Sequence, residues 1–290
     1  MGTLFDYARR GLATGTGAFG ARAVSAAIDR SRLAPRLSRS NYRGGTVSLK
    51  AGPAAAVAGS VAAAVGTRTP AHAAAALTAG LGSGAVGLYD DLVDATAPVT
   101  EPKGLRGHLG ALMSGRVTGG AVKAVGIGLS GLAAAILIDS ARPAKRPRSK
   151  ASRAVNIALG AGVIAGTANL VNLFDLRAGR ALKVVSAVSG PLSARSDSAG
   201  GIAAGTLGAA GALLPEDLAE ETMLGDCGAN ALGALVGLSL AARSAPVTRA
   251  AILAVVAALT VASEKISFTQ VIAETPVLRT IDEYGARPRQ

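Results

Sequence analysis

The chain has 290 residues, of which 50% are hydrophobic and only 17% are charged, and its mean hydropathy is +0.40. A soluble domain carries about a quarter charged residues, so this composition excludes an ordinary soluble or disordered chain and predicts a membrane protein. The single cysteine, Cys227, excludes a disulfide framework, and the low aromatic content of 3% argues against a nucleic-acid stacking platform. We therefore expect membrane lipids, and no nucleic acid, to meet the net charge of +12.

Several apolar stretches approach the roughly 20 residues that a helix needs to cross a bilayer. They lie, in chain order, at 51–67, 71–89, 117–138, 154–174, 198–214, 227–242 and 250–263, with weaker stretches at 11–28 and 184–194. We predict an all-α polytopic membrane protein with roughly 8–10 transmembrane helices in a single domain, residues 1–290. The glycines of 120–131 and 201–211 indicate either close helix contacts or simply a glycine-rich composition.

The loops after residues 28, 89, 174, 214 and 263 would share one side of the membrane. That side holds the larger share of lysines and arginines, although the basic loop 139–153 lies opposite. The positive-inside rule then predicts a multi-pass protein of the cytoplasmic (inner) membrane with this side in the cytoplasm. Lys123 falls within a span, and we expect it to snorkel to the interface rather than to reach a pocket.

The first acidic cluster is Asp90-Asp91-Leu92-Val93-Asp94, at the end of the span 71–89. Acidic groups beside apolar spans are costly, which makes them functional candidates. Adjacent carboxylates repel each other unless a cation compensates them, and carboxylates combined with substrate phosphates suit magnesium. The alternative, a solvated helix end, is less favourable because carboxylates at a helix C-terminus oppose the helix dipole.

A second polar cluster ends the span 154–174. Asn169, Asn172 and Asp175 follow one another at intervals of three, which places them on one helical face. They could line a polar pocket or bond to a neighbouring helix. Arg177 and Arg180 follow them and add a basic edge suited to phosphate.

The third cluster is Gly225-Asp226-Cys227-Gly228, at the start of the span 227–242. Asp226 could cap this helix, because aspartate is a favoured N-cap residue, or it could belong to a metal or phosphate site. Between the first two clusters, the basic segment 101–109 contains Lys103, which could hold phosphate oxygens. We do not expect its lone histidine, His108, to act as a catalytic base.

Together these motifs resemble those of the polyprenyl-phosphate N-acetylhexosamine-1-phosphate transferase family. That family includes the phospho-MurNAc-pentapeptide translocase and the GlcNAc-1-phosphate transferases of cell-envelope synthesis. Residues 90–94 match its DDxxD form, 169–175 its NxxNxxD motif and 225–229 its GDxGS-like motif, while 41–45 is similar to its cytoplasmic basic and glycine-rich segment. The motifs follow the family's order over roughly residues 40–240.

The resemblance implies a magnesium-dependent phosphotransferase acting in cell-wall biogenesis. A polyprenyl-phosphate oxygen would attack the β-phosphate of a UDP-sugar carrying an N-acetylated amino sugar, and UMP would leave. Asp226, with Asp90 and Asp91, would bind Mg²⁺, and Asp90 or Asp91 would accept a proton from the lipid phosphate. The remaining candidates would bind substrate: Lys103, Asn169, Asn172, Asp175, Arg177 and Arg180.

The sequence departs from the family pattern at three places. Ala178 replaces the second aspartate of the family's DGxDG continuation, residues 223–224 lack the usual aromatic, and residues 264–268 lack the histidine-rich segment. These departures favour the alternative of a catalytically silent relative that acts as a membrane scaffold in envelope assembly. A small-solute transporter is a third hypothesis, but the acidic groups lie at span ends and no inverted repeat is evident. A homodimer is compatible with any of the three.

Overall fold

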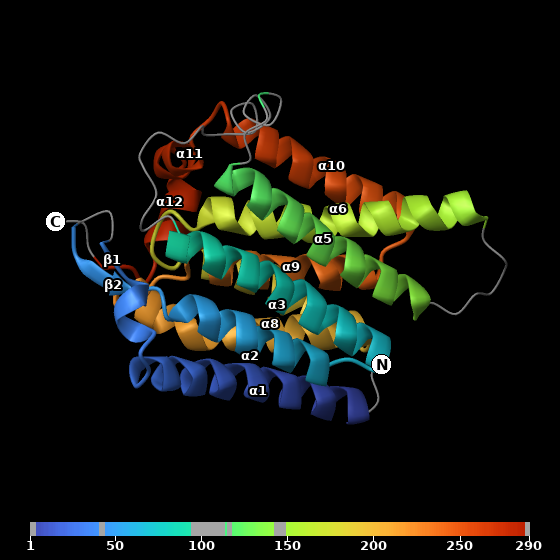
Figure 1. The fold of residues 1–290 in the computed structure, drawn as a ribbon, viewed down its shortest axis with the longest axis horizontal. Coiled ribbons are helices and arrows are strands. Elements are labelled where there is room, and N and C mark those ends of the chain that lie inside the picture. The colour runs from blue at the N-terminus through green and yellow to red at the C-terminus, as the bar shows by residue number, and fades with distance from the viewer. Residues whose placement is uncertain (1–3, 41–43, 94–113, 115–117, 142–148, 288–290) are drawn as a thin grey trace.

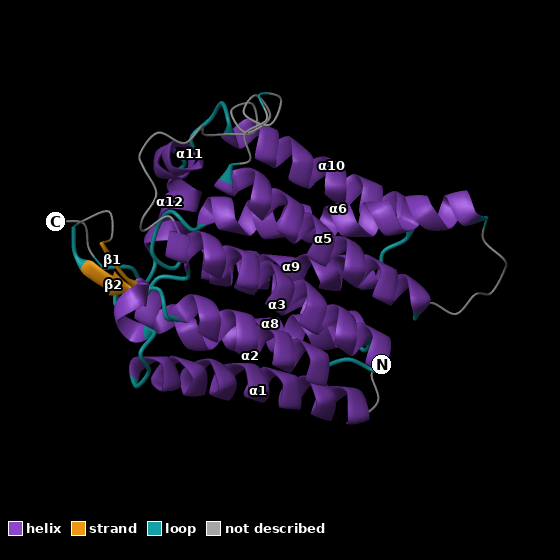
Figure 2. Cartoon of the chain, in the orientation of Figure 1, coloured by secondary structure: helices purple, strands orange, loops and turns teal. Residues whose placement is uncertain are grey.

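The computed structural model describes residues 4–40, 44–93, 114, 118–141 and 149–287. Over these residues the chain is almost entirely helical, and Figure 2 shows one small hairpin formed by β1 (Ser38–Ser40) and β2 (Thr46–Ser48), which pair antiparallel. The predicted all-α class is confirmed. Lys103, His108, Asp94 and the first part of the segment 41–45 lie outside the described residues.

Eleven α-helices occupy the described residues, and Figure 1 shows the long ones running side by side in one bundle. Each predicted span, including the two weak ones, overlaps one helix. The helices are α1 (Leu4–Asp29), α2 (Ala51–Val65), α3 (Pro70–Val93), α5 (Gly119–Ser140), α6 (Lys150–Phe174), α7 (Arg180–Ser193), α8 (Ser198–Leu218), α9 (Gly225–Arg243), α10 (Pro246–Ser263), α11 (Phe268–Glu274) and α12 (Pro276–Glu283).

Five of the described helices are long and apolar enough to cross a membrane, namely α3, α5, α6, α8 and α10, and α2 is a shorter apolar helix. Their outward side chains are apolar: Val125, Leu129 and Val255 are 62%, 60% and 60% exposed, respectively. Exposed apolar side chains on long helices are expected where lipid replaces water. The protein is therefore a polytopic membrane protein. Fewer described helices are long and apolar enough to cross a membrane than the roughly 8–10 expected. One reason is that α9 is enclosed by other helices and needs no apolar face toward lipid.

Polar residues mark the starts of several helices. The side chains of Thr118, Ser149 and Asp197 accept hydrogen bonds from backbone N–H groups in the first turns of α5, α6 and α8, respectively. These groups have no partner within the helix, so the caps stabilise the helix starts and define where the loops end.

The core of the bundle is α9, which packs against α6, α3, α2 and α8. Glycines bring the helix backbones close together. A Cβ atom at Gly201 or Gly205 would overlap backbone atoms of Gly66 and Ala62 at the end of α2, and one at Gly233 would overlap α6. Of the two interpretations of the glycine-rich runs, close helix contact is confirmed for the start of α8.

The end of the bundle opposite the acidic motifs is held by a buried polar network. Arg249, which is fully buried at the start of α10, donates to the backbone oxygen (2.8 Å) and Oδ1 (3.1 Å) of Asn156 in α6. The Asn156 amide and Arg153 in turn donate to Asp139 at the end of α5. Buried polar groups are tolerated when their partners are supplied, so this network fixes α5, α6 and α10 relative to one another.

Candidate functional site

The end of α3 meets the start of α9. Asp91 Oδ1 accepts a hydrogen bond from the backbone N–H of Asp226 (3.1 Å), and its Oδ2 accepts one from the N–H of Cys227 (2.9 Å). The position before α9 is Leu224, which offers no side-chain cap. Asp91 therefore supplies the N-terminal cap of α9 from another helix, and the interpretation of Asp226 as that cap is wrong.

Two glycines permit this approach. Gly225 has φ of +60°, a left-handed conformation that favours glycine, and a Cβ there would lie 3.1 Å from both carboxylate oxygens of Asp91. A Cβ at Gly87, one turn before Asp91, would overlap the Asp226 carbonyl group. The glycines that flank the acidic motifs thus set the distance between α3 and α9.

Lys123 bridges two of the motif carboxylates. Its Nζ lies 3.1 Å from Asp90 Oδ2 and also pairs with Asp226 Oδ2. The three side chains are 17%, 16% and 25% exposed for Lys123, Asp90 and Asp226, so the cluster is partly shielded from water. The expectation that Lys123 snorkels to the interface is wrong, because the two carboxylates attract its ammonium group more strongly.

This arrangement explains how two adjacent carboxylates can lie beside an apolar span. Asp91 is compensated by N–H groups at the start of α9, where the helix dipole is positive. Asp90 is compensated by Lys123. The repulsion predicted from the sequence is thus balanced by two different positive partners.

The described ranges contain no set of three or more His, Cys, Asp or Glu side chains arranged to hold a metal ion. However, Asp90 and Asp226 each direct one oxygen toward the same ammonium group, which shows that a cation is accommodated between them. Magnesium in proteins commonly binds one or two carboxylates together with waters and substrate phosphates. Asp90 and Asp226 therefore match part of such a coordination shell, and they do not form a closed protein cage.

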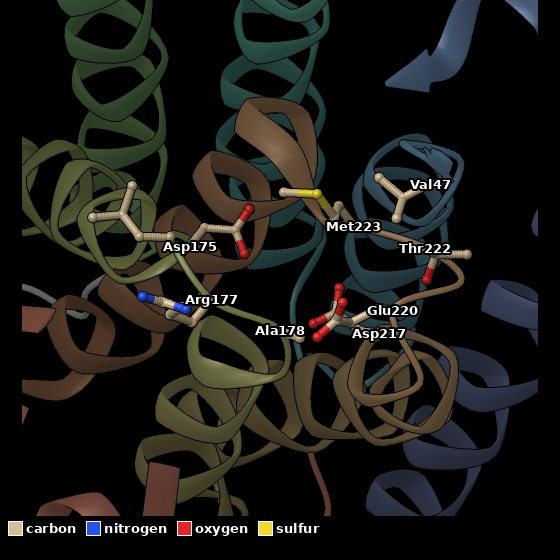
Figure 3. A pocket seen from close by; sticks show the side chains of 9 residues that line it. Val47, Asp175, Arg177, Ala178, Asp217, Glu220, Thr222 and Met223 are labelled. Atoms are coloured by element: carbon tan, nitrogen blue, oxygen red, sulfur yellow. The ribbon is translucent and has the colours of Figure 1, made fainter. Parts of the chain in front are cut away.

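A small pocket lies beside this cluster. In Figure 3, the carboxylate of Asp175, from the loop after α6, lies across from Asp217, in the last turn of α8, and Glu220, just after it. Its lining consists of Val47, Asp175, Leu176, Arg177, Ala178, Asp217, Glu220, Thr222 and Met223.

Asp175 connects the pocket to the carboxylate cluster. Burial raises the pKa of its carboxyl well above the usual value, and the nearby charges of Asp217 and Asp226 raise it further. The backbone N–H of Gly225 donates to this carboxyl and opposes the shift. The carboxyl of Asp175 thus lies between the pocket and the start of α9, within electrostatic range of Asp226.

The loops around the pocket are tied together by backbone and carboxylate hydrogen bonds. Asp217 accepts a hydrogen bond from the backbone N–H of Gly179, which has φ of +73° in the loop after α6. Ser48 of β2 exchanges backbone hydrogen bonds with Glu221 (3.2 Å) and Met223 (2.9 Å), just before α9. The small hairpin therefore supports the loop that presents Asp226.

The structure separates the remaining substrate-binding candidates. Arg177 lines the pocket, as a phosphate-binding role requires. Asn169 is exposed on α6, and Asn172 is half-buried but does not line the pocket.

Arg180 is buried, and its guanidinium forms two hydrogen bonds to Asp282 of α12, at 2.7 and 2.9 Å. Its Nη1 donates to Thr269 of α11 at 3.0 Å. The expectation that Arg180 binds substrate is therefore not supported, because the arginine holds the C-terminal helices instead.

Sequence reasoning missed Asp217 and Glu220. The signal available was the acidic run of residues 216–221, which separates two apolar spans and therefore meets the same criterion as the other clusters. It also missed that Lys123 belongs to the site.

Neither a scan against protein-family models nor a search of curated proteins finds a match to this chain. The family resemblance therefore rests on the motifs themselves and on their convergence in space.

Proposed function

We propose that this protein transfers a sugar-1-phosphate from a UDP-sugar to polyprenyl phosphate, with Mg²⁺, at the cytoplasmic face of the inner membrane. The observation that carries the proposal is the convergence of the motif carboxylates. Asp91 and Asp226 are 135 residues apart in the sequence, yet they contact each other, and Asp90 and Asp175 lie within the same end of the bundle. The motif resemblance supports an N-acetylated amino sugar as the sugar and cell-envelope glycan synthesis as the setting.

The chemistry is a phosphoryl transfer. An oxygen of the lipid phosphate forms a bond to the β-phosphorus, the bond from that phosphorus to the bridging oxygen breaks, and UMP leaves with the bonding electron pair. Asp226 and Asp90 would hold Mg²⁺, which when bound neutralises charge on the diphosphate. The Lys123 ammonium, already between these two residues, adds a second positive charge where negative charge develops.

The two adjacent aspartates have different tasks in this proposal. Both oxygens of Asp91 are occupied by N–H groups of α9, so Asp91 positions Asp226. Asp90 pairs through Oδ2 with Lys123 and accepts no backbone N–H from α9 among the contacts of the described residues, so its carboxylate is the better placed of the two to accept a proton from the lipid phosphate.

The polar side chains around the pocket beside Asp175 suit the nucleoside part of the donor. Its carboxylates, Asp175, Asp217 and Glu220, repel phosphate but accept hydrogen bonds from ribose hydroxyls and base N–H groups. Arg177 provides the positive charge that a phosphate at the pocket edge requires.

The test is incubation of the purified protein with polyprenyl phosphate, Mg²⁺ and a panel of radiolabelled UDP-sugars. We expect one donor to yield lipid-extractable label, and we expect chelation of Mg²⁺ to stop the transfer. Arg177→Ala should raise KM for that donor with a smaller effect on kcat. Absence of lipid-linked label with every donor would contradict the proposal.

A catalytically silent scaffold is the second candidate, and two observations favour it. The Lys123 ammonium already compensates Asp90 and Asp226 without any metal. Ala178, which lines the pocket, also replaces an aspartate of the family that the motifs resemble. A scaffold would leave every donor unused while the protein remained folded, which the same assay detects.

A further inference from the structure

The C-terminal helices α11 and α12 attach to the bundle through polar contacts. Besides the Arg180–Asp282 pair, Lys183 of α7 donates to the backbone oxygens of Ile281 (3.0 Å) and Asp282 (2.7 Å). One aromatic contact accompanies them, because Phe268 of α11 stacks on Phe174 of α6 with ring centroids 5.3 Å apart. Figure 1 shows both helices at the same end of the bundle as the hairpin.

The apolar face of α12 points away from the protein. Val277, Leu278 and Ile281 fall on one side of the helix, because residues four apart share a face, and they are 69%, 43% and 56% exposed. Tyr284, just after the helix, is 80% exposed. A helix on a water-soluble surface buries its apolar face, whereas α12 leaves its apolar face exposed and none of its residues is fully buried.

The position of α12 relative to the spanning helices indicates which surroundings its apolar face contacts. α10 is long and apolar enough to cross the membrane and ends at Ser263, and α11 begins at Phe268, only a few residues later. Phe174, on which Phe268 stacks, is the last residue of the spanning helix α6. Both attachments therefore hold the C-terminal helices at the level where spanning helices leave the hydrocarbon layer.

We propose that α12 lies in the plane of the membrane interface, with Val277, Leu278 and Ile281 inserted at the boundary of headgroups and acyl chains. Interfacial helices bind in this way through an apolar face, and tyrosine is enriched at the same level, as Tyr284 would be. Arg279 and Arg287 are balanced by Glu274 and Glu283, so apolar contact rather than headgroup charge drives the binding. The proposal does not depend on the transferase activity.

The test uses the full-length protein in phospholipid vesicles. Cys227 is only 1% exposed, so the parent serves as the labelling background for variants that carry one added cysteine. Ile281→Cys and Val277→Cys place an environment-sensitive fluorophore on the apolar face, and Arg279→Cys places it on the opposite side. Quenching is compared for a nitroxide attached near the top of the lipid acyl chain and for iodide in the aqueous phase.

We expect lipid-borne quenching to be several-fold stronger at positions 277 and 281 than at 279, and quenching by iodide to show the opposite order. The order should be the same in vesicles with and without anionic lipid. Equal quenching at all three positions would overturn the proposal. Shielding of Ile281→Cys from both quenchers, together with its cross-linking into a dimer, would also overturn it and would assign the face to a second copy of the chain.

Discussion

Removal of the Lys123 charge should destabilise the protein by about 3 kcal/mol. At 3.1 Å, the Lys123–Asp90 attraction is about 5 kcal/mol with an effective dielectric constant of about 20, and desolvation offsets a large part of it. Lys123→Met keeps the length of the side chain but leaves Asp90 and Asp226 facing each other without a cation. For a chain of this size the loss corresponds to a fall in melting temperature of about 5 °C.

Cys227 provides the assay for this prediction. The cysteine is 1% exposed and lies next to Asp226, so a fluorogenic thiol reagent reports when the site unfolds. Adding Asp226→Asn to Lys123→Met should recover part of the lost stability, because one of the two repelling charges is removed. Lys123→Arg, which retains the charge, is the matched control.

Magnesium should also restore part of the stability that the Lys123→Met variant loses. If Asp90 and Asp226 hold the ion, Mg²⁺ should raise the melting temperature of Lys123→Met more than that of the parent, because stabilisation follows binding to the native state. Two results would refute the reasoning: an unchanged melting temperature in Lys123→Met, or a fall that neither Asp226→Asn nor Mg²⁺ relieves.

Three further predictions concern the surroundings of the site. Because the pKa of Asp175 is raised in the folded protein, the free energy of unfolding falls as pH rises from the ordinary pKa of aspartate toward that higher value. Asp175→Asn should therefore have a higher melting temperature than the parent at about pH 8, and the difference should shrink as pH falls. Gly87→Ala should abolish transfer and lower the melting temperature by forcing α3 from α9, whereas Gly128→Ala, which meets nothing within 4 Å, should leave both unchanged. Arg180→Ala should increase proteolysis within residues 276–287, and Asp282→Asn should reproduce the effect in the same gel-based assay. Equal protection in parent and variants would contradict the attachment of α12 through the Arg180–Asp282 pair.

The positions of the helices could be predicted well from apolar runs, because lipid requires long apolar segments and helices that satisfy their own backbone groups. The convergence of the acidic motifs followed from their placement at span ends on one side of the membrane. The contact of Asp91 with the N–H groups of Asp226 and Cys227 could not be predicted, because it depends on the exact approach of α3 to α9. That approach is set by Gly87 and Gly225, whose neighbours are remote in the sequence.

Lys123 and Arg180 show why roles of single charged residues are harder to predict. A lysine within an apolar span is equally compatible with snorkelling and with an internal ion pair, and only the positions of Asp90 and Asp226 decide between them. Likewise, Arg180 follows a polar motif in the sequence, but its partner Asp282 lies 102 residues away on α12. Spacing along one helix contains no information about such partners.

The most direct measurement is the rate at which purified protein releases UMP from its UDP-sugar donor in the presence of polyprenyl phosphate and Mg²⁺. We predict that Asp226→Asn lowers kcat by at least about 10²-fold, the effect of losing one main electrostatic contact to the transition state. Asp29→Asn, which removes a carboxylate paired with Lys50 outside the pocket lining, should retain the parent rate. Equal rates of UMP release in the parent and Asp226→Asn would contradict a reaction centred on the converging carboxylates.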